Sequence, residues 1–343
     1  TLFTPGGYRD PRTFKADVQI THTVSGLHLQ VLAGYHHTDF LPRVTDLNLA
    51  AAPSGTTQEG RAVYGTLVQQ GGLLVAMPGS NRRLPGYDLV SAIASTGFSN
   101  YYQAGFGLSR ETARGLSFSA EYLWSRTRDN WLQSWNGDPA DLLSPFPQDR
   151  PGHEWVEGIS DFDVPHRVTV LATWRAGGKT PVSVGARYRF RSGFPFTPGF
   201  PAGVDANGDG SSANDPAFVD PSIPGITPLL NTHPCLRDQT GRFAARNSCR
   251  EAGNHALDVN LTLGLPFHSL GGRLELRLDV FNLATTATGV VDRALVLVDP
   301  AGSVTTDSQG NITLPLVANP DFGKLLARRT PPRIVRFGLQ LAY

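Results

Sequence analysis

The chain has 343 residues, with 30 Lys or Arg against 29 Asp or Glu, so its net charge is close to zero. This balance argues against a nucleic-acid partner, because such a protein needs a basic surface to displace counterions from phosphates. No run of about 18 apolar residues occurs, which excludes a transmembrane helix. The first residues show no signal peptide, so we expect either a cytosolic protein or a chain that has lost its true beginning.

Apolar and polar residues alternate along the chain, and no helical period appears. The first two predicted strands are Phe14–Val24 and Leu27–His36, and only Ser25-Gly26 separates them, as in a tight hairpin. Three further hairpins and a terminal strand repeat the pattern: Tyr102–Leu108 with Leu116–Trp124, Val168–Trp174 with Val182–Phe190, Leu257–Leu265 with Leu274–Val280, and then Val335–Tyr343. We therefore predict nine antiparallel strands.

Long connections join one hairpin to the next. They are rich in Gly, Pro, Asn and Asp, and their pieces RAVYGTLVQQ, ALVLVD and NITLPLV are predicted either to extend strands or to form small hairpins. Loops this long are unusual in a compact soluble domain. Short turns at one end and long loops at the other are typical of an outer-membrane β-barrel, with the turns periplasmic and the loops extracellular.

The two faces of the predicted strands differ in composition. One face carries Leu, Val, Phe, Tyr and Trp, and the other carries charges predicted to face a wet lumen: Arg187, Arg189, Arg191, Asp258, Arg277 and Arg336. Aromatic residues near strand ends fit the girdles at a membrane interface. An all-β transmembrane barrel is favoured over a soluble β-sandwich, although a sandwich would also alternate.

The predicted number of strands indicates whether the chain forms a complete barrel. Single-chain bacterial barrels have an even number of strands, and here the first strand starts at a long-loop end. Nine strands therefore predict an incomplete part of a larger barrel, and a lumen lined with charges suggests a wide one. We expect a curved, incompletely closed sheet.

Several segments, in this order, resemble the last part of a known family. They are SDFDVPHRVTVLATW, GARYRFRSGFPFTP, DANGDGSSANDPAFVD, LELRLDVFNLA and the aromatic C-terminus. This series is similar to TonB-dependent outer-membrane receptors, and most of all to the Oar-like group with a carboxypeptidase-regulatory-like domain. One departure is DVFNLATTATG, where the family more often has a second asparagine after FNL.

The resemblance implies a barrel of about 22 strands in the outer membrane of a Gram-negative bacterium. Residues 1–343 would be its C-terminal portion, without the plug and the earlier strands. The implied partners are outer-membrane lipid, the TonB complex through the missing N-terminal part, and an unidentified extracellular ligand. The terminal strand, with Phe337, Leu339, Leu341 and Tyr343, would be recognised by the barrel-insertion machinery.

A calcium loop is a candidate between Asp205 and Gly210. Asp205, Asn207 and Asp209 match the first half of a D-x-[DN]-x-[DN]-G pattern, and oxygen ligands at this spacing suit calcium. Pro216 stands where a bidentate glutamate is expected, so Asp215 or Asp220 would have to replace it. The alternative is a solvent loop rich in turn-forming residues. No other cofactor is expected.

Two further features lie in the long connections. Cys235 and Cys249 are predicted to form a loop-closing disulfide rather than a reactive thiol pair. Trp131, Trp135 and Trp155 are candidate ligand contacts, although they could equally pack their own loop. No nucleophile motif accompanies the histidines, so no enzyme is expected.

We therefore expect the barrel of a TonB-dependent receptor. Its extracellular loops would capture a ligand, and energised transport would carry that ligand through the plugged lumen. Two alternatives stay open at this stage. One is a complete small barrel with a structural or adhesive role, and the other is a secreted, calcium-stabilised β-sandwich that binds glycans.

Overall fold

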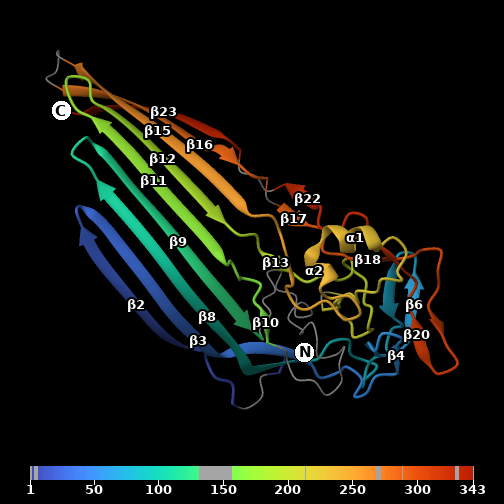
Figure 1. Ribbon diagram of the computed structural model, residues 1–343. Helices are drawn as coiled ribbons and strands as arrows, with labels where there is room; N and C mark the ends of the chain where they lie inside the picture. The colour runs from blue at the N-terminus through green and yellow to red at the C-terminus, as the bar shows by residue number, and fades with distance from the viewer. Residues whose placement is uncertain are drawn as a thin grey trace.

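A long antiparallel sheet with a folded cap at one end makes up the protein in a computed structural model (Figure 1). The structure describes residues 2–3, 7–130, 157–212, 214–267, 272–287, 289–328 and 332–342. Within them, none of the helices is long and apolar enough to cross a membrane.

The nine predicted strands are confirmed, and most extend beyond their predicted ends. They are β2 (Arg12–Val24), β3 (Leu27–Asp46), β8 (Ser91–Glu111), β9 (Leu116–Asp129), β11 (His166–Ala176), β12 (Val182–Arg191), β15 (Asn254–Phe267), β16 (Gly272–Thr285) and β23 (Ile334–Ala342). Each pairs with the next in chain order, and β1 (Leu2–Phe3) and β10 (Gly158–Ile159) pair alongside β8 and β9. In the described part β2 and β23 do not pair with each other, so the barrel is not closed, as expected.

Short turns and long connections lie at opposite ends of the sheet. The hairpin turns gather at the end where the C-terminus lies, whereas the long connections run into the cap at the other end (Figure 1). In the first turn Ser25 and Gly26 both have a positive φ, of 50° and 74°. Two successive residues of this kind form the turn whose twist suits a two-residue hairpin.

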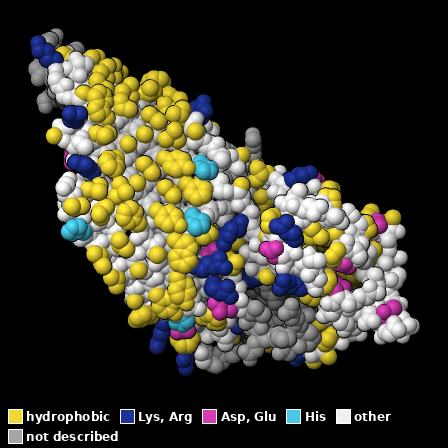
Figure 2. Space-filling view, viewed as in Figure 1, with side chains coloured by type: hydrophobic (Ala, Val, Ile, Leu, Met, Phe, Trp, Pro, Cys, Tyr) yellow, Lys and Arg dark blue, Asp and Glu magenta, His cyan; other side chains and the backbone are white. Residues whose placement is uncertain are grey.

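The register places the apolar residues on one continuous face. Val170 lies opposite Tyr188, and Trp174 lies opposite Val184. Because directly opposed residues point to the same side of a sheet, this pairing extends the apolar face from strand to strand. Figure 2 shows it as a broad hydrophobic surface, and Phe337 and Leu339 on β23 are 83% and 75% exposed.

No second sheet covers this apolar face in the part of the chain that the structure describes. A β-sandwich requires such a cover, since its apolar faces pack against each other. The sandwich alternative is therefore wrong, and the apolar face is the one that lipid contacts.

Charged and polar side chains occupy the opposite face, where they pair. All six charges predicted from the sequence to face a lumen lie on it: Arg187, Arg189, Arg191, Asp258, Arg277 and Arg336. Arg189 Nη2 lies 3.1 Å from Asp258 Oδ2, and Arg277 Nε lies 3.0 Å from Asp279. Their proximity neutralises charge on a surface that lipid does not contact.

A bulge explains the asparagine of the FNLA segment. The pairing of β15 with β16 shifts between Leu257 and Val259, and Asn282 has a φ of 54°. The Asn282 backbone N–H donates to Asp258 Oδ1 at 2.9 Å. Asparagine is among the few residues other than glycine that adopt this conformation readily, so the motif fixes the bulge.

The cap is built from the described parts of the connections 47–90, 192–253 and 286–333. It contains β4 (Gly55–Thr57), β5 (Ala62–Val63), β6 (Leu67–Gln70), β7 (Leu73–Ala76), β13 (Pro195–Phe196), α1 (Thr227–Thr232), α2 (Pro234–Arg237), β14 (Cys249–Arg250), β17 (Gly289–Val291), β18 (Val296–Val298), β19 (Thr305–Thr306), β20 (Asn311–Thr313), β21 (Leu316–Ala318) and β22 (Leu325–Arg328). The small strands predicted within RAVYGTLVQQ, ALVLVD and NITLPLV are among them.

Two hydrophobic clusters hold the cap together. One joins the second and third connections through residues such as Ile226, Leu236 and Leu295, all fully buried. The other brings all three together, with Leu74 and Val204 at its centre. Each such side chain contributes about 1.5–3 kcal/mol when it leaves water, so the loops form a folded body with its own core.

A charge on the lipid-facing side of β23 tests the assignment of the faces. We expect Leu339→Arg to cost about 2–4 kcal/mol of folding free energy in a bilayer, because the guanidinium would lie in hydrocarbon. Gln340→Arg is the matched control, since Gln340 lies opposite Glu275 on the polar face. Urea unfolding of the full-length protein in lipid vesicles measures both, and equal losses would contradict the assignment.

Gly34 tests the packing on the polar face. There Asp17 accepts hydrogen bonds from His36 at 3.0 Å and from Gln103 Nε2 at 2.8 Å. A Cβ at Gly34 would overlap Asp17 Oδ1 and lie 2.7 Å from Gln103 Nε2, so both side chains would have to move, and we expect Gly34→Ala to destabilise by the loss of their hydrogen bond, about 0.5–1.5 kcal/mol.

Gly107→Ala is the control for this substitution, because a Cβ there would meet Gln30 at an ordinary 3.5 Å. The same unfolding measurement compares the two variants. A Gly34→Ala protein as stable as Gly107→Ala would show that the Asp17 network does not depend on this close approach.

Candidate functional site in the cap

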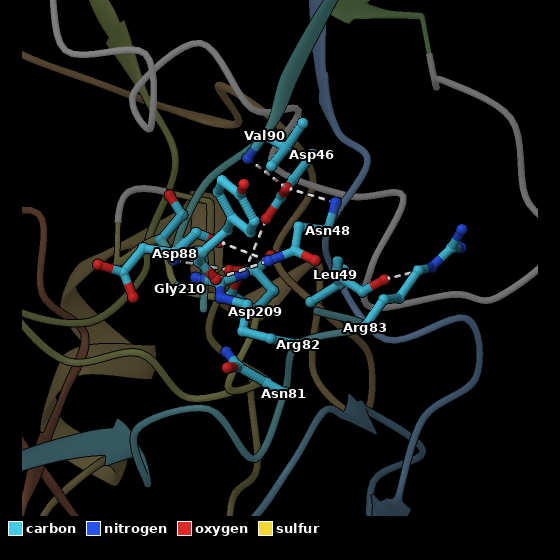
Figure 3. Close-up of polar contacts among 12 residues, drawn as sticks. Asp46, Asn48, Leu49, Asn81, Arg82, Arg83, Asp88, Val90, Asp209 and Gly210 are labelled. Atoms are coloured by element: carbon cyan, nitrogen blue, oxygen red, sulfur yellow. Dashed lines mark hydrogen bonds and ion pairs between the residues drawn. The ribbon is translucent and has the colours of Figure 1, made fainter. Parts of the chain in front are cut away.

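Asp46, at the end of β3, anchors the base of the cap (Figure 3). Its Oδ1 accepts the backbone N–H groups of Asn48 at 2.8 Å and Val90 at 3.2 Å, and its Oδ2 lies 2.8 Å from Arg82 Nη1. Asn48 and Val90 stand at the two ends of the first connection. One carboxylate therefore closes that loop where it leaves the sheet.

The first connection also holds the acidic loop at 205–215. Arg82 Nη1 donates to the carbonyl of Asp209 at 3.4 Å, and Asn81 Nδ2 donates to the carbonyl of Gly208 at 2.6 Å. The Tyr64 backbone N–H donates to the carbonyl of Asn207 at 2.8 Å. The main-chain carbonyls of the predicted calcium loop thus accept hydrogen bonds that fix the loop in place from outside.

Within the acidic loop the carboxylates accept hydrogen bonds from the loop itself. Asp205 accepts the N–H groups of Gly208 at 2.7 Å and Gly210 at 2.8 Å. Asp209 accepts the Ser211 N–H at 2.7 Å and an Asn214 amide N–H, also at 2.7 Å. These bonds shape a tight turn, in which Gly208 and Gly210 have positive φ values of 71° and 97°.

Burial sets the electrostatics of this loop. Asp205 is 7% exposed and Asp209 only 1%. Burial raises the pKa of Asp205 to about 7, and repulsion from the Asp209 carboxylate adds to the rise. Burial also raises the pKa of Asp209. Two buried acids that resist ionisation together are an environment that a cation would stabilise.

The third predicted carboxylate has a different neighbour. Asp215 Oδ1 lies 3.2 Å from Arg61 Nη1, and Asp215 Oδ2 accepts the Ala206 N–H at 2.8 Å. Arg61 is fully buried, and its guanidinium carbon lies 5.5 Å from the ring centre of Phe200 and 4.8 Å from that of Phe243. Asp215 therefore neutralises a buried arginine.

The donor set of Asp205, Asn207 and Asp209 has the oxygen chemistry that calcium needs. Among the described residues, however, no group of three or more His, Cys, Asp or Glu side chains is arranged to hold a metal ion. Calcium binding stays a prediction, with Asp205 and Asp209 as its two acidic ligands.

A second set of buried ion pairs joins the cap to the sheet. Arg246 Nη1 lies 2.6 Å from Asp129 Oδ1 at the end of β9, and Arg250 pairs with Asp163. Asp163 also accepts the Thr127 N–H at 2.6 Å. The segment SDFDVPHR is thus where the cap docks onto the strands, which gives this stretch of the resemblance a structural role.

Cys235 and Cys249 form a disulfide with a Cα–Cα distance of 5.4 Å. Cys249 lies in β14 within the larger hydrophobic cluster, and Cys235 lies in α2 against it. The bond therefore links a helix to a strand of the same core. On a chain-entropy estimate a loop of this length contributes about 3 kcal/mol.

Some candidate residues lie outside the described residues. These are Trp131, Trp135 and Trp155 of the proposed ligand loop and Tyr343 of the C-terminal signal. The other residues of that signal, Phe337, Leu339 and Leu341, lie on β23 opposite Leu278, Leu276 and Leu274.

Sequence reasoning missed the arginines that organise the cap. Arg61, Arg82, Arg246 and Arg250 each bind a carboxylate from a distant part of the chain. No period or motif marks them, because their partners are far apart in sequence.

The comparisons with known proteins agree with this architecture. The family described as "Outer membrane beta barrel domain" matches residues 31–319. The chain belongs to this outer-membrane β-barrel family. None of the curated proteins matches the sequence.

One solved structure is similar to this barrel: the FrpB iron transporter from Neisseria meningitidis (F3-3 variant). The identity is 12% and the TM-score 0.42, over 84% of this chain and 29% of that one. Family membership, together with the exposed apolar face, places the barrel in the outer membrane of a Gram-negative bacterium.

The acidic loop yields a pH-dependent prediction. The pKa of Asp205 rises from 3.8 to about 7 on folding, so without metal the contribution of Asp205 to the stability of the cap is fully present below about pH 4 and is lost as the pH rises through about 7. Calcium would stabilise the ionised pair and offset that loss. At one hundred times its Kd it should add about 2.7 kcal/mol.

Thermal unfolding of the full-length protein in detergent, with and without calcium chloride, measures this effect. We expect calcium to raise the unfolding temperature at pH 8 and not at pH 4, and Asp205→Asn to abolish the response. Asp307→Asn is the control, because Asp307 lies in an exposed turn where hydrogen bonds from Asn311 lower its pKa. No calcium response at pH 8 would leave the solvent-loop interpretation.

Proposed function

We propose that this barrel belongs to a TonB-dependent receptor that captures an extracellular ligand in its cap and passes it along the polar face of the barrel. The observation that carries the proposal is the folded cap. Three long connections share two hydrophobic clusters at one end of the sheet. An ordered body of this kind can present fixed side chains to a ligand, which separate flexible loops cannot do without an entropic cost.

The polar face supports a transport role. Its charges pair, as between Arg189 and Asp258, and the Asp17–His36–Gln103 network continues this polar surface on β2, β3 and β8. A surface with satisfied charges lets a hydrated solute pass without binding it tightly. We infer no catalysis at this site.

The proposal predicts energy-dependent accumulation. Cells that express the full-length protein, with and without a working TonB protein, are supplied with a mixture of peptides, oligosaccharides and metal chelates too large for porins. Mass spectrometry then measures which compounds the cells retain. We expect at least one compound to accumulate only when receptor, TonB and a proton gradient are all present.

Two results would contradict this function. Entry of small solutes regardless of TonB would indicate an open pore. Retention of no compound, with receptor-dependent attachment of the cells to surfaces, would favour a structural or adhesive barrel.

A further inference from the structure

An aromatic belt marks where the lipid-facing side of the sheet meets the cap. The Tyr122 hydroxyl lies 2.9 Å from His166 Nδ1, and the Tyr188 hydroxyl lies 2.6 Å from His255 Nδ1. These pairs bridge neighbouring strands near their cap ends. Rings with one apolar and one polar part favour the membrane–water interface, so the belt fixes the height of the outer leaflet's headgroups.

Two arginines of β9 point outward directly beyond this belt. Arg126 lies opposite Tyr102, and Arg128 lies opposite Asn100. Arg126 follows Trp124 by two residues, so both side chains project from the apolar side of the sheet. Two residues advance about 6.7 Å along a strand. The guanidinium groups therefore lie beyond the aromatic belt, at the level of the lipid headgroups.

These arginines line a cavity of about 490 Å³ between β9, β10 and the cap segment 242–248. Asn247 Nδ2 donates to the carbonyl of Ile159 at 2.8 Å, which holds that segment beside β10. Ile159 and Phe243 supply apolar lining, while Arg242 adds a further cation. Basic side chains gather between the hydrophobic face and the cap in Figure 2.

The cavity has more positive than negative charge. Arg128 Nε lies 3.0 Å from Glu157, and Arg246 is neutralised by Asp129 and Asp161. Arg126 makes no hydrogen bond or ion pair with any residue that the structure describes, and Arg242 donates to the carbonyl of Asp238. Among the described residues, Arg126 and Arg242 are therefore the two arginines of the cavity that no carboxylate neutralises.

An unused hydroxyl also lines the cavity. Ser248 Oγ is buried and has no hydrogen-bond partner within the described ranges. Leaving a buried hydroxyl unpaired costs about 1–3 kcal/mol, and a ligand oxygen would satisfy it. Cations, a free hydroxyl and apolar lining together suit a group that is both anionic and attached to a hydrophobic body.

We propose that this cavity binds the phosphate groups of a lipid in the outer leaflet of the membrane. The surface is continuous with the lipid-facing side, so such a lipid is already present at high local concentration. Arg126 and Arg242 contact the phosphate oxygens, Ser248 donates its hydroxyl proton to one of them, and Ile159 and Phe243 pack against the apolar part of the headgroup. The bound lipid seals the joint between strand β9 and the cap.

Binding of fluorescent lipid A to the full-length protein in detergent tests the proposal. We expect Arg126→Gln and Arg242→Gln each to raise the Kd by about five-fold, the effect of one basic residue near an anionic lipid surface. Arg126→Lys, which keeps the charge, should retain most of the affinity. Lipid A without its phosphates should bind weakly and equally to all variants.

Arg110→Gln is the matched control. Arg110 projects from the same apolar side, opposite Phe118, at the turn end of β8. An equal loss in Arg110→Gln, or undiminished binding of the dephosphorylated lipid, would overturn the proposal. So would displacement of the lipid by inorganic phosphate at matched phosphate concentration, since the cavity would then be a site for the free anion. Unchanged thermal unfolding of the variants separates lost binding from lost folding.

Discussion

The pairing of backbone N–H and C=O groups between neighbouring strands is the constraint on which the rest of the structure depends. In hydrocarbon an unpaired group has no water to bond and costs several kcal/mol, so a membrane segment that is not helical must be a paired strand. Nine strands from β2 to β23 meet this condition through one antiparallel ladder. A slip of one residue would carry Arg189 and Asp258 to the lipid side, so the register is fixed by both faces at once.

The cap is stabilised differently from the sheet, because its connections lie outside the main ladder. Ordering these connections costs conformational entropy. Their own hydrophobic core, the Cys235–Cys249 disulfide and arginines buried against carboxylates offset that cost. Losing one partner of such a pair leaves a buried, unpaired charge, which destabilises the fold by about 3–5 kcal/mol. The pairs therefore favour one docking arrangement over others. Arg246 and Arg250 therefore do more than stabilise: they determine where the cap meets β9 and the segment before β11.

In two regions of the cap, neighbouring side chains do not balance the charges of the residues present. In the acidic loop, Asp205 and Asp209 are buried close together, and in the cavity beside β9 cations outnumber acids. A bound cation would balance the charge of the acidic loop, and a bound anion would balance that of the cavity. Both regions lie where the cap joins the barrel, so the proposed calcium ion and lipid phosphate would neutralise the excess charge at this junction.

The sequence by itself determined the strands, their order and the two faces, because alternation with period two is a local property. The alternation along Val335–Tyr343 predicted one apolar face for this strand, and the register confirms it, since Val335, Phe337 and Leu339 lie opposite Val280, Leu278 and Leu276. The loop connections were predicted in length but not in shape, and the Asp205 turn was found only because its motif is local. Tertiary structure alone decided that Asp215 neutralises Arg61, that Arg82 ties Asp46 to the acidic loop and that Arg126 borders a cavity. These contacts join residues far apart in the chain, and no local pattern encodes which distant partner a buried charge will meet.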